Sequence, residues 1–423
     1  MSSIQSRVNL SSFSCSSRDF TRKKSALRTI AFYFSLIFIF TIPWEDMVLI
    51  GGFGFARVAG FPMAAFWMVM VVGTGRIRRL RFFHIAVWLF VLWNIASVFW
   101  SIDVDSTVQH IITYSQLAGM VLILWDLSIS PGALKAVLQA YVLGAYIAIG
   151  STVINYLRGI EEDNLRFAAT GFNANDLGLT LALGLPVAWY LAMSGTNSNK
   201  AHLLRLVNYA YFPAAILAIL LTASRGSLVA AIPALFFVLA SLSRPRLLHR
   251  VLILAILIAA LFGVQTLVPQ SSFQRLATIP SSIAEANIGD RVDIWREGVA
   301  VFSEHPLSGI GGRAFRAGVE SGKFAHNTFL SILVEVGLIG FGLFAVILAI
   351  VVFQAIRHPR WEAAFWLTVL SVWAIGNSVH NWEDRKATWL FLSLVIVSAA
   401  LVVRQAVSDQ SETLPVKKIA MLH

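Results

Sequence analysis

A histidine and an asparagine stand at the mouth of a long apolar run, KFAHNTFLSILVEVGLIGFGLFAVILAIVV, at residues 323–352. Polar groups at membrane depth are costly and usually serve a function. The N-terminal end of a helix favours neutral imidazole, which is the form that a general base requires. We therefore predict that His326 is a catalytic base and that Asn327 fixes its tautomer. The alternative is an interfacial histidine without a catalytic role.

Three arginines are expected on the same side of the membrane as His326. Arg225 stands in LTASRGSLV between two apolar spans, Arg291 opens an amphipathic helix, and Arg166 leads into a further span. Guanidinium groups bind phosphate through paired, charge-assisted hydrogen bonds that a lysine cannot reproduce. These arginines indicate a phosphorylated ligand that arrives from the lipid, and Arg296 is expected on the same face. For each arginine, a solvated or headgroup-facing position is the alternative.

Further polar and small residues follow His326 along the same predicted helix. Glu335 lies nine residues later, which at about 100° per residue places it half a turn round the helix. It is therefore not the direct partner of His326, and we interpret it as a buried carboxyl group that is protonated or paired with another helix. Gly337, Gly340 and Gly342 predict close packing between helices, because small residues let backbones approach.

Two other patterns could carry chemistry. His380 in SVHNWEDRKATW forms a second His-Asn pair at a helix end, and we expect an interfacial role for it rather than a place beside His326. The DVD triplet at residues 103–105 resembles a divalent-ion motif, but we interpret it as an acidic outer loop.

The elements that position these residues are predicted to span a membrane. The chain is 57% hydrophobic and only 13% charged, whereas soluble domains are about one quarter charged. The sequence thus predicts an all-α integral membrane protein with about twelve transmembrane helices. Spans of suitable length lie near 29–45, 52–73, 84–100, 108–128, 134–157, 172–193, 206–223, 226–242, 251–268, 326–355, 362–380 and 387–404. No small-residue cleavage site follows the first span, so we expect a retained helix there rather than a signal peptide.

The net charge of +11 is explained by topology rather than by nucleic-acid binding. With both termini in the cytoplasm, the inside segments hold 21 of the 33 Lys and Arg residues. This bias obeys the positive-inside rule. The single cysteine, Cys15, excludes an internal disulfide.

The predicted organisation has five parts. A disordered cytoplasmic tail covers residues 1–28, nine helices follow over 29–268, a large periplasmic loop covers 269–325, three helices follow over 326–404, and a second cytoplasmic tail ends the chain at 405–423. A loop of this length without function would be unusual. Its amphipathic helix should place Ile294, Trp295, Gly298, Val299 and Phe302 on one side, and should end at Pro306 and the glycines after it.

The spacing of these residues resembles a known family. His326-Asn327, nine residues and then Gly337 to Gly340 fit the pattern H-[NSQ]-x9-G-x-x-[GTY] of the bacterial O-antigen ligases. The flanking RVDIWREGVAVFSEHPLSGIGGRAF, together with FWSIDVDST and TGFNANDLG, looks like the shared region of the O-antigen ligase and polymerase superfamily. The resemblance covers the chain from about residue 85 to residue 400.

This resemblance implies a metal-independent glycosyltransferase without a cofactor. Its donor would be a glycan on undecaprenyl diphosphate, and its acceptor would be another glycan or lipid A–core. It assigns Arg225 and Arg291 to the diphosphate and His326 to the essential histidine, and Arg166, Asn175 and Asn327 to the same substrate site. In-line displacement predicts inversion at the anomeric carbon.

The expected function is therefore glycan polymerisation or ligation on the periplasmic face of a bacterial inner membrane, in O-antigen, capsule or exopolysaccharide synthesis. Partners would be the lipid-linked donor, the acceptor, the bilayer and other polysaccharide assembly and export proteins. A flippase or transporter of lipid-linked oligosaccharide is the alternative from another class, and a non-catalytic scaffold is a third. The polar residues crowd the outer third of the bundle rather than its midplane, which favours the enzyme.

Overall fold

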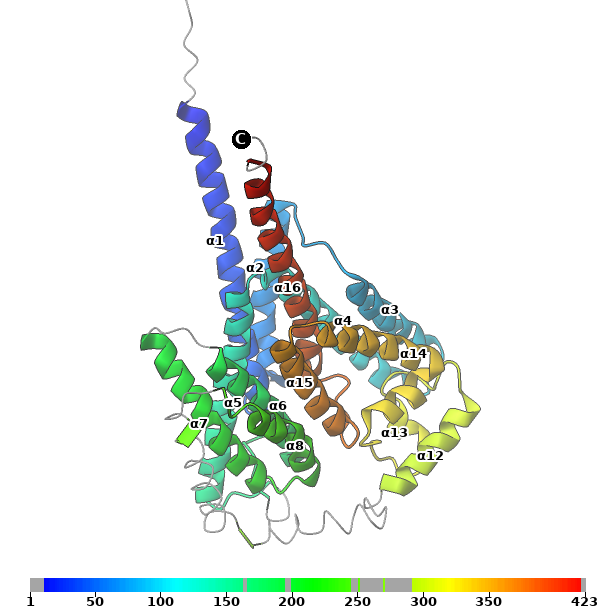
Figure 1. Cartoon of the computed structure of the whole chain (residues 1–423). Helices are drawn as coiled ribbons and strands as arrows, with labels where there is room; N and C mark the ends of the chain where they lie inside the picture. Colours follow the sequence, from blue (N-terminus) through cyan, green and yellow to red (C-terminus); the bar gives the residue numbers. More distant parts are fainter. Residues whose placement is uncertain are drawn as a thin grey trace, which may run out of the picture.

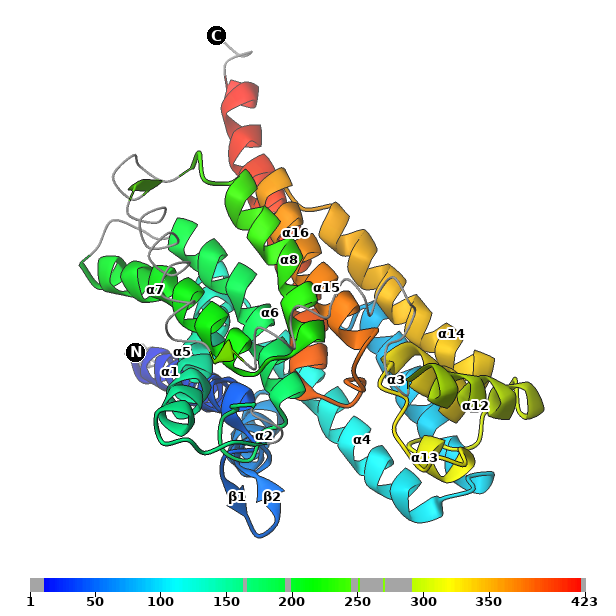
Figure 2. The ribbon, with the colours of Figure 1, turned by 90° about the horizontal axis from the view of Figure 1, so that it is seen from below.

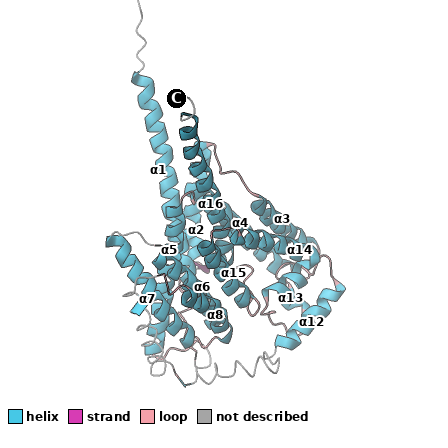
Figure 3. Cartoon of the chain, viewed as in Figure 1, coloured by secondary structure: helices cyan, strands magenta, loops and turns pink. Residues whose placement is uncertain are grey.

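The computed structural model describes residues 11–162, 166–194, 199–244, 250–251, 269–270 and 291–419. Helices dominate this part of the chain, as Figures 1 and 3 show, and the predicted all-α class is confirmed. The α-helices are α1 (Ser11–Thr41), α2 (Phe55–Thr74), α3 (Phe82–Ala96), α4 (Val104–Leu127), α5 (Pro131–Leu157), α6 (Ala174–Met193), α7 (Asn199–Leu221), α8 (Arg225–Ala240), α12 (Arg291–Glu304), α13 (Phe315–Gly318), α14 (Thr328–Ile356), α15 (Arg360–Asn377) and α16 (Lys386–Ile419). Two 3-10 helices, η1 (Ile42–Trp44) and η2 (Ser97–Phe99), and one antiparallel hairpin of β1 (Leu49–Ile50) and β2 (Phe53–Gly54) complete the described elements.

Nine of the described helices are long and apolar enough to cross a membrane. They correspond to the first seven predicted spans and to the predicted spans at 326–355 and 387–404. α8 and α15 occupy two more predicted spans, but α8 is a shorter apolar helix and α15 is not among the nine. The predicted span at 251–268 lies outside the described residues, and so do residues 271–290 of the predicted loop. A total of twelve spans therefore stays a prediction.

Both predicted tails differ from the expectation of disorder. α1 begins at Ser11, inside the predicted tail 1–28, and α16 continues to Ile419, through most of the predicted tail 405–423. Extending an existing helix by one residue costs far less than nucleating a new one. The helical tails therefore continue the apolar spans, and residues 11–28 contain no proline or glycine that would stop them.

α6 is the central helix and positions one side of the site. Every residue from Leu177 to Ala192 is buried, and α6 packs against α5, α7, α8 and α15 (Figure 2). A helix that is apolar on all sides is stable only when other helices surround it. Small residues allow this enclosure, since Gly184 leaves room for the Tyr211 hydroxyl, which donates to the Leu181 carbonyl at 3.1 Å.

α14 is interrupted at Gly337, which has φ 67° and ψ −171°. This left-handed region is accessible to glycine without strain from a Cβ. Backbone groups of the loop before α14 replace the helical hydrogen bonds that the break removes. The bonds are Leu338 N to Pro306 O (2.8 Å), Ile339 N to Leu307 O (3.3 Å), Ile310 N to Val334 O (3.2 Å) and Gly311 N to Glu335 O (2.8 Å).

The role predicted for the three glycines of α14 is thus correct for one of them. Gly340 packs closely against Val336 and Trp93, as expected. Gly337 instead permits the break, because a Cβ there would meet the Leu307 carbonyl and the amide of Gly309. Gly342 has open space around it.

The amphipathic helix predicted in the loop is present as α12, and it ends two residues before Pro306. It packs against α14, with Ile294 and Gly298 buried and the Trp295 indole donating to the Ala325 carbonyl at 2.8 Å. Val299, which was predicted on the same side as Ile294 and Gly298, is 55% exposed, so the packed face is narrower than the apolar stripe. The loop helix is therefore anchored directly above the start of α14.

Candidate functional site

His326 lies immediately before α14 in a left-handed backbone conformation, with φ 47°. This conformation is uncommon for residues other than glycine and is frequent at functional sites. The adjacent Asn327 is the N-cap of α14, and its Oδ1 accepts from the amides of Phe329 (3.0 Å) and Leu330 (3.1 Å). The carbonyl oxygen of Asn327 thus satisfies the helix end, and its role in fixing the histidine tautomer stays a prediction.

The surroundings of His326 favour neutral imidazole. Burial lowers the pKa of His326, the positive charge of Arg291 lowers it further, and Asp176 opposes the shift. Burial and charge therefore favour the neutral form that a proton acceptor requires. From the sequence, the N-terminal end of the helix had been the expected cause.

Arg225 is the first residue of α8, directly after the N-cap Ser224. The preceding Ala223 has a positive φ of 48°, so the turn between α7 and α8 is tightly shaped. Arg166 is only 5% exposed; its Nε donates to the Thr222 carbonyl at 2.9 Å and its second guanidinium nitrogen donates to Asn175 Oδ1 at 2.7 Å. Arg166 and Asn175 thus brace the turn that presents Arg225.

Arg291 begins α12 and is half-buried. Burial lowers its pKa, and the positive charge of Arg225 lowers it further. Two guanidinium groups from distant segments therefore lie within electrostatic reach of each other, an arrangement that an anion between them would stabilise. Arg296, predicted on the same face, instead has a side chain that is 76% exposed and pairs with Asp293 at 2.9 Å.

His380 is a site residue whose position the sequence did not predict. It is only 4% exposed, so the expected interfacial role is wrong. Burial lowers its pKa to about 4, and Asp176, Arg291 and His326 all lie within electrostatic reach. Its Nε2 has no hydrogen-bond partner among the described residues, and it faces Gly226, the residue after Arg225. In the sequence, the second His-Asn pair was the one pattern that pointed to His380 as a site residue.

A network of ion pairs borders this cluster and was also not foreseen. Asp176 accepts from the Trp382 indole at 2.8 Å and from the Arg385 guanidinium at 2.6 Å. Arg385 also contacts Asp46 at 3.2 Å, and Lys386 pairs with Glu45. These residues come from α6, from the start of α16 with the segment before it, and from the segment after η1.

Glu335 shares a hydroxyl group with a second buried acid. Ser331 Oγ lies 3.2 Å from Glu335 Oε1 and 3.1 Å from Glu383 Oε1, and Glu335 Oε2 accepts from the Arg313 amide at 2.8 Å. A hydroxyl has one proton, so both contacts are hydrogen bonds only when one carboxyl group is protonated. Burial, with the charge of Asp384, raises the pKa of Glu383 to about 7. Glu335 therefore ties the loop to α14 and is not a partner of His326, as predicted.

The DVD triplet has a local role in the helix end. Asp103 is the N-cap of α4 and accepts from the Ser106 amide at 3.1 Å. Across the described ranges, no group of three His, Cys, Asp or Glu side chains is arranged to hold a metal ion.

Comparison with protein families identifies the central part of the chain. Residues 210–345 match the family model described as O-Antigen ligase, which confirms the resemblance to the O-antigen ligase and polymerase superfamily. The matched stretch contains Arg225, Arg291, His326 and Gly337. No curated protein matches the chain.

Proposed function

We propose that this member of the O-antigen ligase and polymerase superfamily is a periplasmic-face glycosyltransferase that moves a glycan from undecaprenyl diphosphate to an acceptor hydroxyl. The observation that carries the proposal is the convergence of Arg225, Arg291 and His326 from three separate elements. The bond between the anomeric carbon and the diphosphate breaks as the acceptor oxygen forms its bond to the same carbon, with inversion. The chain would lie in a bacterial inner membrane with both termini in the cytoplasm.

The two arginines would bind the diphosphate that leaves. Their mutual repulsion, together with the burial of Arg291, makes the empty site unfavourable and an anion favourable. By analogy with oxyanion-hole donors, one contact aimed at developing charge contributes about 2.7–4 kcal/mol. These side chains can therefore stabilise the leaving group without a metal ion. Arg166 and Asn175 would act by holding the turn that carries Arg225.

His326 would accept the proton of the attacking hydroxyl. A positioned general base contributes about 10²–10⁴-fold to a rate. Asn327 holds the end of α14 and so fixes the backbone of His326. His380 lies where its unpartnered nitrogen could hold the imidazole or the substrate in position.

A flippase would bind the same lipid diphosphate without making a bond. The structure favours the enzyme, because the arginines converge on a histidine that is kept neutral. Binding of an anion alone requires no such base. A non-catalytic scaffold would require neither group.

The test is product formation by the purified protein given only a lipid-linked repeat unit. A polymerase yields a ladder of longer lipid-linked glycans, and His326→Ala abolishes it. His305→Ala is the matched control, because His305 is an exposed histidine of the same loop. If no ladder forms, lipid A–core is added as acceptor to reveal a ligase. Equal product from His326→Ala and from the unmodified protein, with either acceptor, would overturn the proposal.

A further inference from the structure

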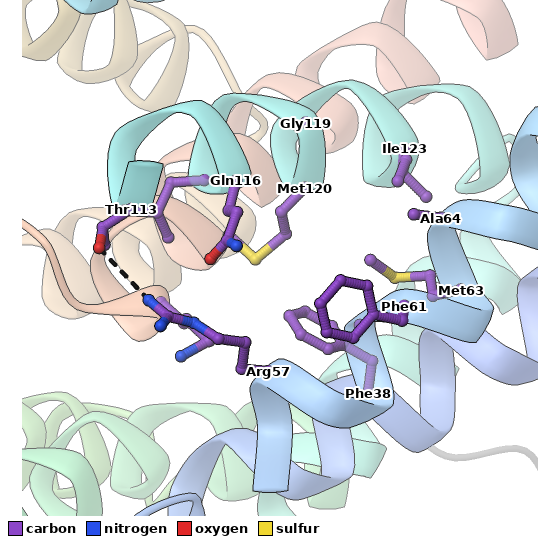
Figure 4. A pocket seen from close by; sticks show the side chains of 13 residues that line it. Phe38, Arg57, Phe61, Met63, Ala64, Thr113, Gln116, Gly119, Met120 and Ile123 are labelled. Carbon is purple, nitrogen blue, oxygen red and sulfur yellow. Dashed lines mark hydrogen bonds between the residues drawn. The ribbon is translucent and has the colours of Figure 1, made fainter. Parts of the chain in front are cut away.

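An apolar groove that Arg225, Arg291 and His326 do not line opens between α1, α2 and α4 (Figure 4). It has a volume of about 210 Å³. Its lining residues are Phe38, Arg57, Gly60, Phe61, Met63, Ala64, Thr113, Gln116, Leu117, Gly119, Met120, Ile123 and Lys386. The walls are aromatic, aliphatic and thioether side chains, and Gly119 has no atom within 4 Å of where a Cβ would stand. The groove can therefore accept an apolar chain along its length.

The groove is polar at one end only. In Figure 4, Arg57 and Thr113 lie at one end and Ile123 and Ala64 at the other. Arg57 makes a long hydrogen bond to Thr113, at 3.4 Å, and its guanidinium lies over the Phe53 ring, 5.2 Å from the ring centre. Lys386 also lines the groove, and it pairs with Glu45. The Glu45 carbonyl accepts from the Phe55 amide at 3.2 Å, so Lys386 lies near the start of α2. Two cationic side chains thus stand where an apolar chain would end in an anionic head.

The polar end leads toward His326. Lys386 follows Arg385, which binds Asp176, and Asp176 lies within electrostatic reach of His326. The side chains of Arg385 and Asp176 are 33% and 20% exposed, so this ion pair borders the path that a glycan would follow. A lipid held in the groove would therefore present its glycan along this polar path to the general base.

The size of the groove limits its occupant. Ligand pockets that enclose a drug-sized molecule measure about 300–1,000 Å³, so this groove holds part of one chain and leaves the rest in the bilayer. The groove therefore takes part of a single apolar chain at a time.

We propose that the groove is the acceptor-lipid site and that its ligand is a single-chain polyisoprenyl diphosphate bearing a glycan. The diphosphate would bind Arg57 and Lys386, and the isoprenoid chain would lie over Gly119. This inference rests on the proposed function and makes it a polymerase, since donor and acceptor are then both lipid-linked repeat units. The acceptor hydroxyl loses its proton to His326 and bonds the donor's anomeric carbon. The acceptor stays on its own lipid, and the donor lipid leaves as its diphosphate.

The experiment blocks the groove with Gly119→Leu. Gly342→Leu is the matched control, because Gly342 is a helical glycine with equally open surroundings on α14, outside the groove. Initial rates are measured with one lipid-linked donor and two acceptors, a lipid-linked glycan and the same glycan without lipid. We expect Gly119→Leu to raise the KM for the lipid-linked acceptor at least tenfold and to leave the rate with the lipid-free acceptor unchanged. Arg57→Gln should raise the same KM.

Binding is measured separately, so that the groove can be judged without turnover. Native mass spectrometry of the detergent-purified protein uses polyisoprenyl diphosphate, the corresponding alcohol and a two-chain phosphatidylglycerol as probes. We expect the Gly119→Leu variant to bind less polyisoprenyl diphosphate but as much phosphatidylglycerol as the unmodified protein, whereas the Gly342→Leu variant should bind both lipids normally. Equal loss of phosphatidylglycerol would identify an ordinary phospholipid site, and a raised KM for the donor alone would identify a donor site. Either result would overturn the inference, whereas absence of turnover with intact selective binding would count only against the transferase.

Discussion

At the scale of single residues, the neutral form of His326 gives a pH dependence that can be measured. Burial and Arg291 lower its pKa from 6.5, so His326, the proposed proton acceptor, stays neutral down to a lower pH than a free imidazole does. We expect kcat/KM to rise with pH through a value below 6.5. Arg291→Gln removes one cation, which raises the pKa of His326 and moves this acid limb to higher pH. The measurement is the pH profile of kcat/KM for both proteins.

The control for that profile is Arg296→Gln. Arg296 lies on the same helix as Arg291 but is exposed and paired with Asp293. Its replacement should leave the acid limb in place. An acid limb that does not move in Arg291→Gln would show that the titrating base lies beyond the reach of Arg291, and so is not His326.

Glu383 predicts a pH dependence of stability. Its pKa is raised from 4.5 to about 7 by burial, so the folded protein favours the protonated acid. This stabilisation is complete below pH 4.5 and is lost as the pH rises through about 7. At about 1.4 kcal/mol per unit, the free energy of unfolding should fall by up to about 3 kcal/mol across this range. Glu383→Gln should remove this component, which thermal unfolding in detergent from pH 5 to pH 8 would measure.

The comparison that decides the assignment is the difference in melting temperature between the variant and the unmodified protein. This difference should grow in favour of Glu383→Gln as the pH rises. A constant difference would mean that Glu383 is not the group that titrates.

The sequence predicted which residues would lie together in the candidate site better than it predicted the contacts around them. The motif spacing and the placement of arginines in apolar loops predicted that Arg225, Arg291 and His326 would share a site, and the structure brings them within electrostatic reach. The contact between Asp176 and Arg385 joins residues 209 positions apart, and no local pattern encodes it. The burial of His380 likewise depends on α8, so the sequence around it indicated only a helix end.

At the scale of secondary-structure elements, Gly337 should be the least replaceable glycine of α14. Gly337→Ala would place a Cβ against the Leu307 carbonyl in a left-handed conformation, which costs about 1–3 kcal/mol before the collision is counted. Gly342→Ala, at a helical position with open space, should instead stabilise by about 0.5–1 kcal/mol. Melting temperatures of the two variants check this, and similar shifts for both would contradict the role assigned to the break.

The break explains why helix patterning alone misread this element. The apolar run of 326–355 is continuous in the sequence, and residues 328–355 of this run are helical as expected. The interruption depends on hydrogen bonds that the amides of Leu338 and Ile339 donate to the carbonyls of Pro306 and Leu307, about thirty residues earlier. Glycine in an apolar helix is compatible with both close packing and a positive φ, so composition could not separate the two.

At the scale of the whole molecule, hydropathy predicted the positions of most membrane helices, whereas the orientation inferred from charge stays a prediction. Nine of the twelve predicted spans coincide with helices of sufficient length, because each needs only a continuous apolar stretch. The packing of these helices around α6 could not be predicted, since it depends on which small residues face which neighbour. The groove beside α2 could not be predicted either, because it is formed by side chains of four helices, α1, α2, α4 and α16.

The orientation of the chain can be tested with introduced cysteines, because Cys15 is its single cysteine and can be replaced. In a Cys15→Ser background, Glu320→Cys should react with a membrane-impermeant maleimide added to spheroplasts, because Glu320 is exposed in the loop before His326. Arg244→Cys, exposed after α8, should react only after the membrane is permeabilised. The reason is the excess of Lys and Arg on the side that carries Arg244, which the positive-inside rule assigns to the cytoplasm. The reverse pattern would place His326 on the cytoplasmic side, out of reach of glycans that face the periplasm.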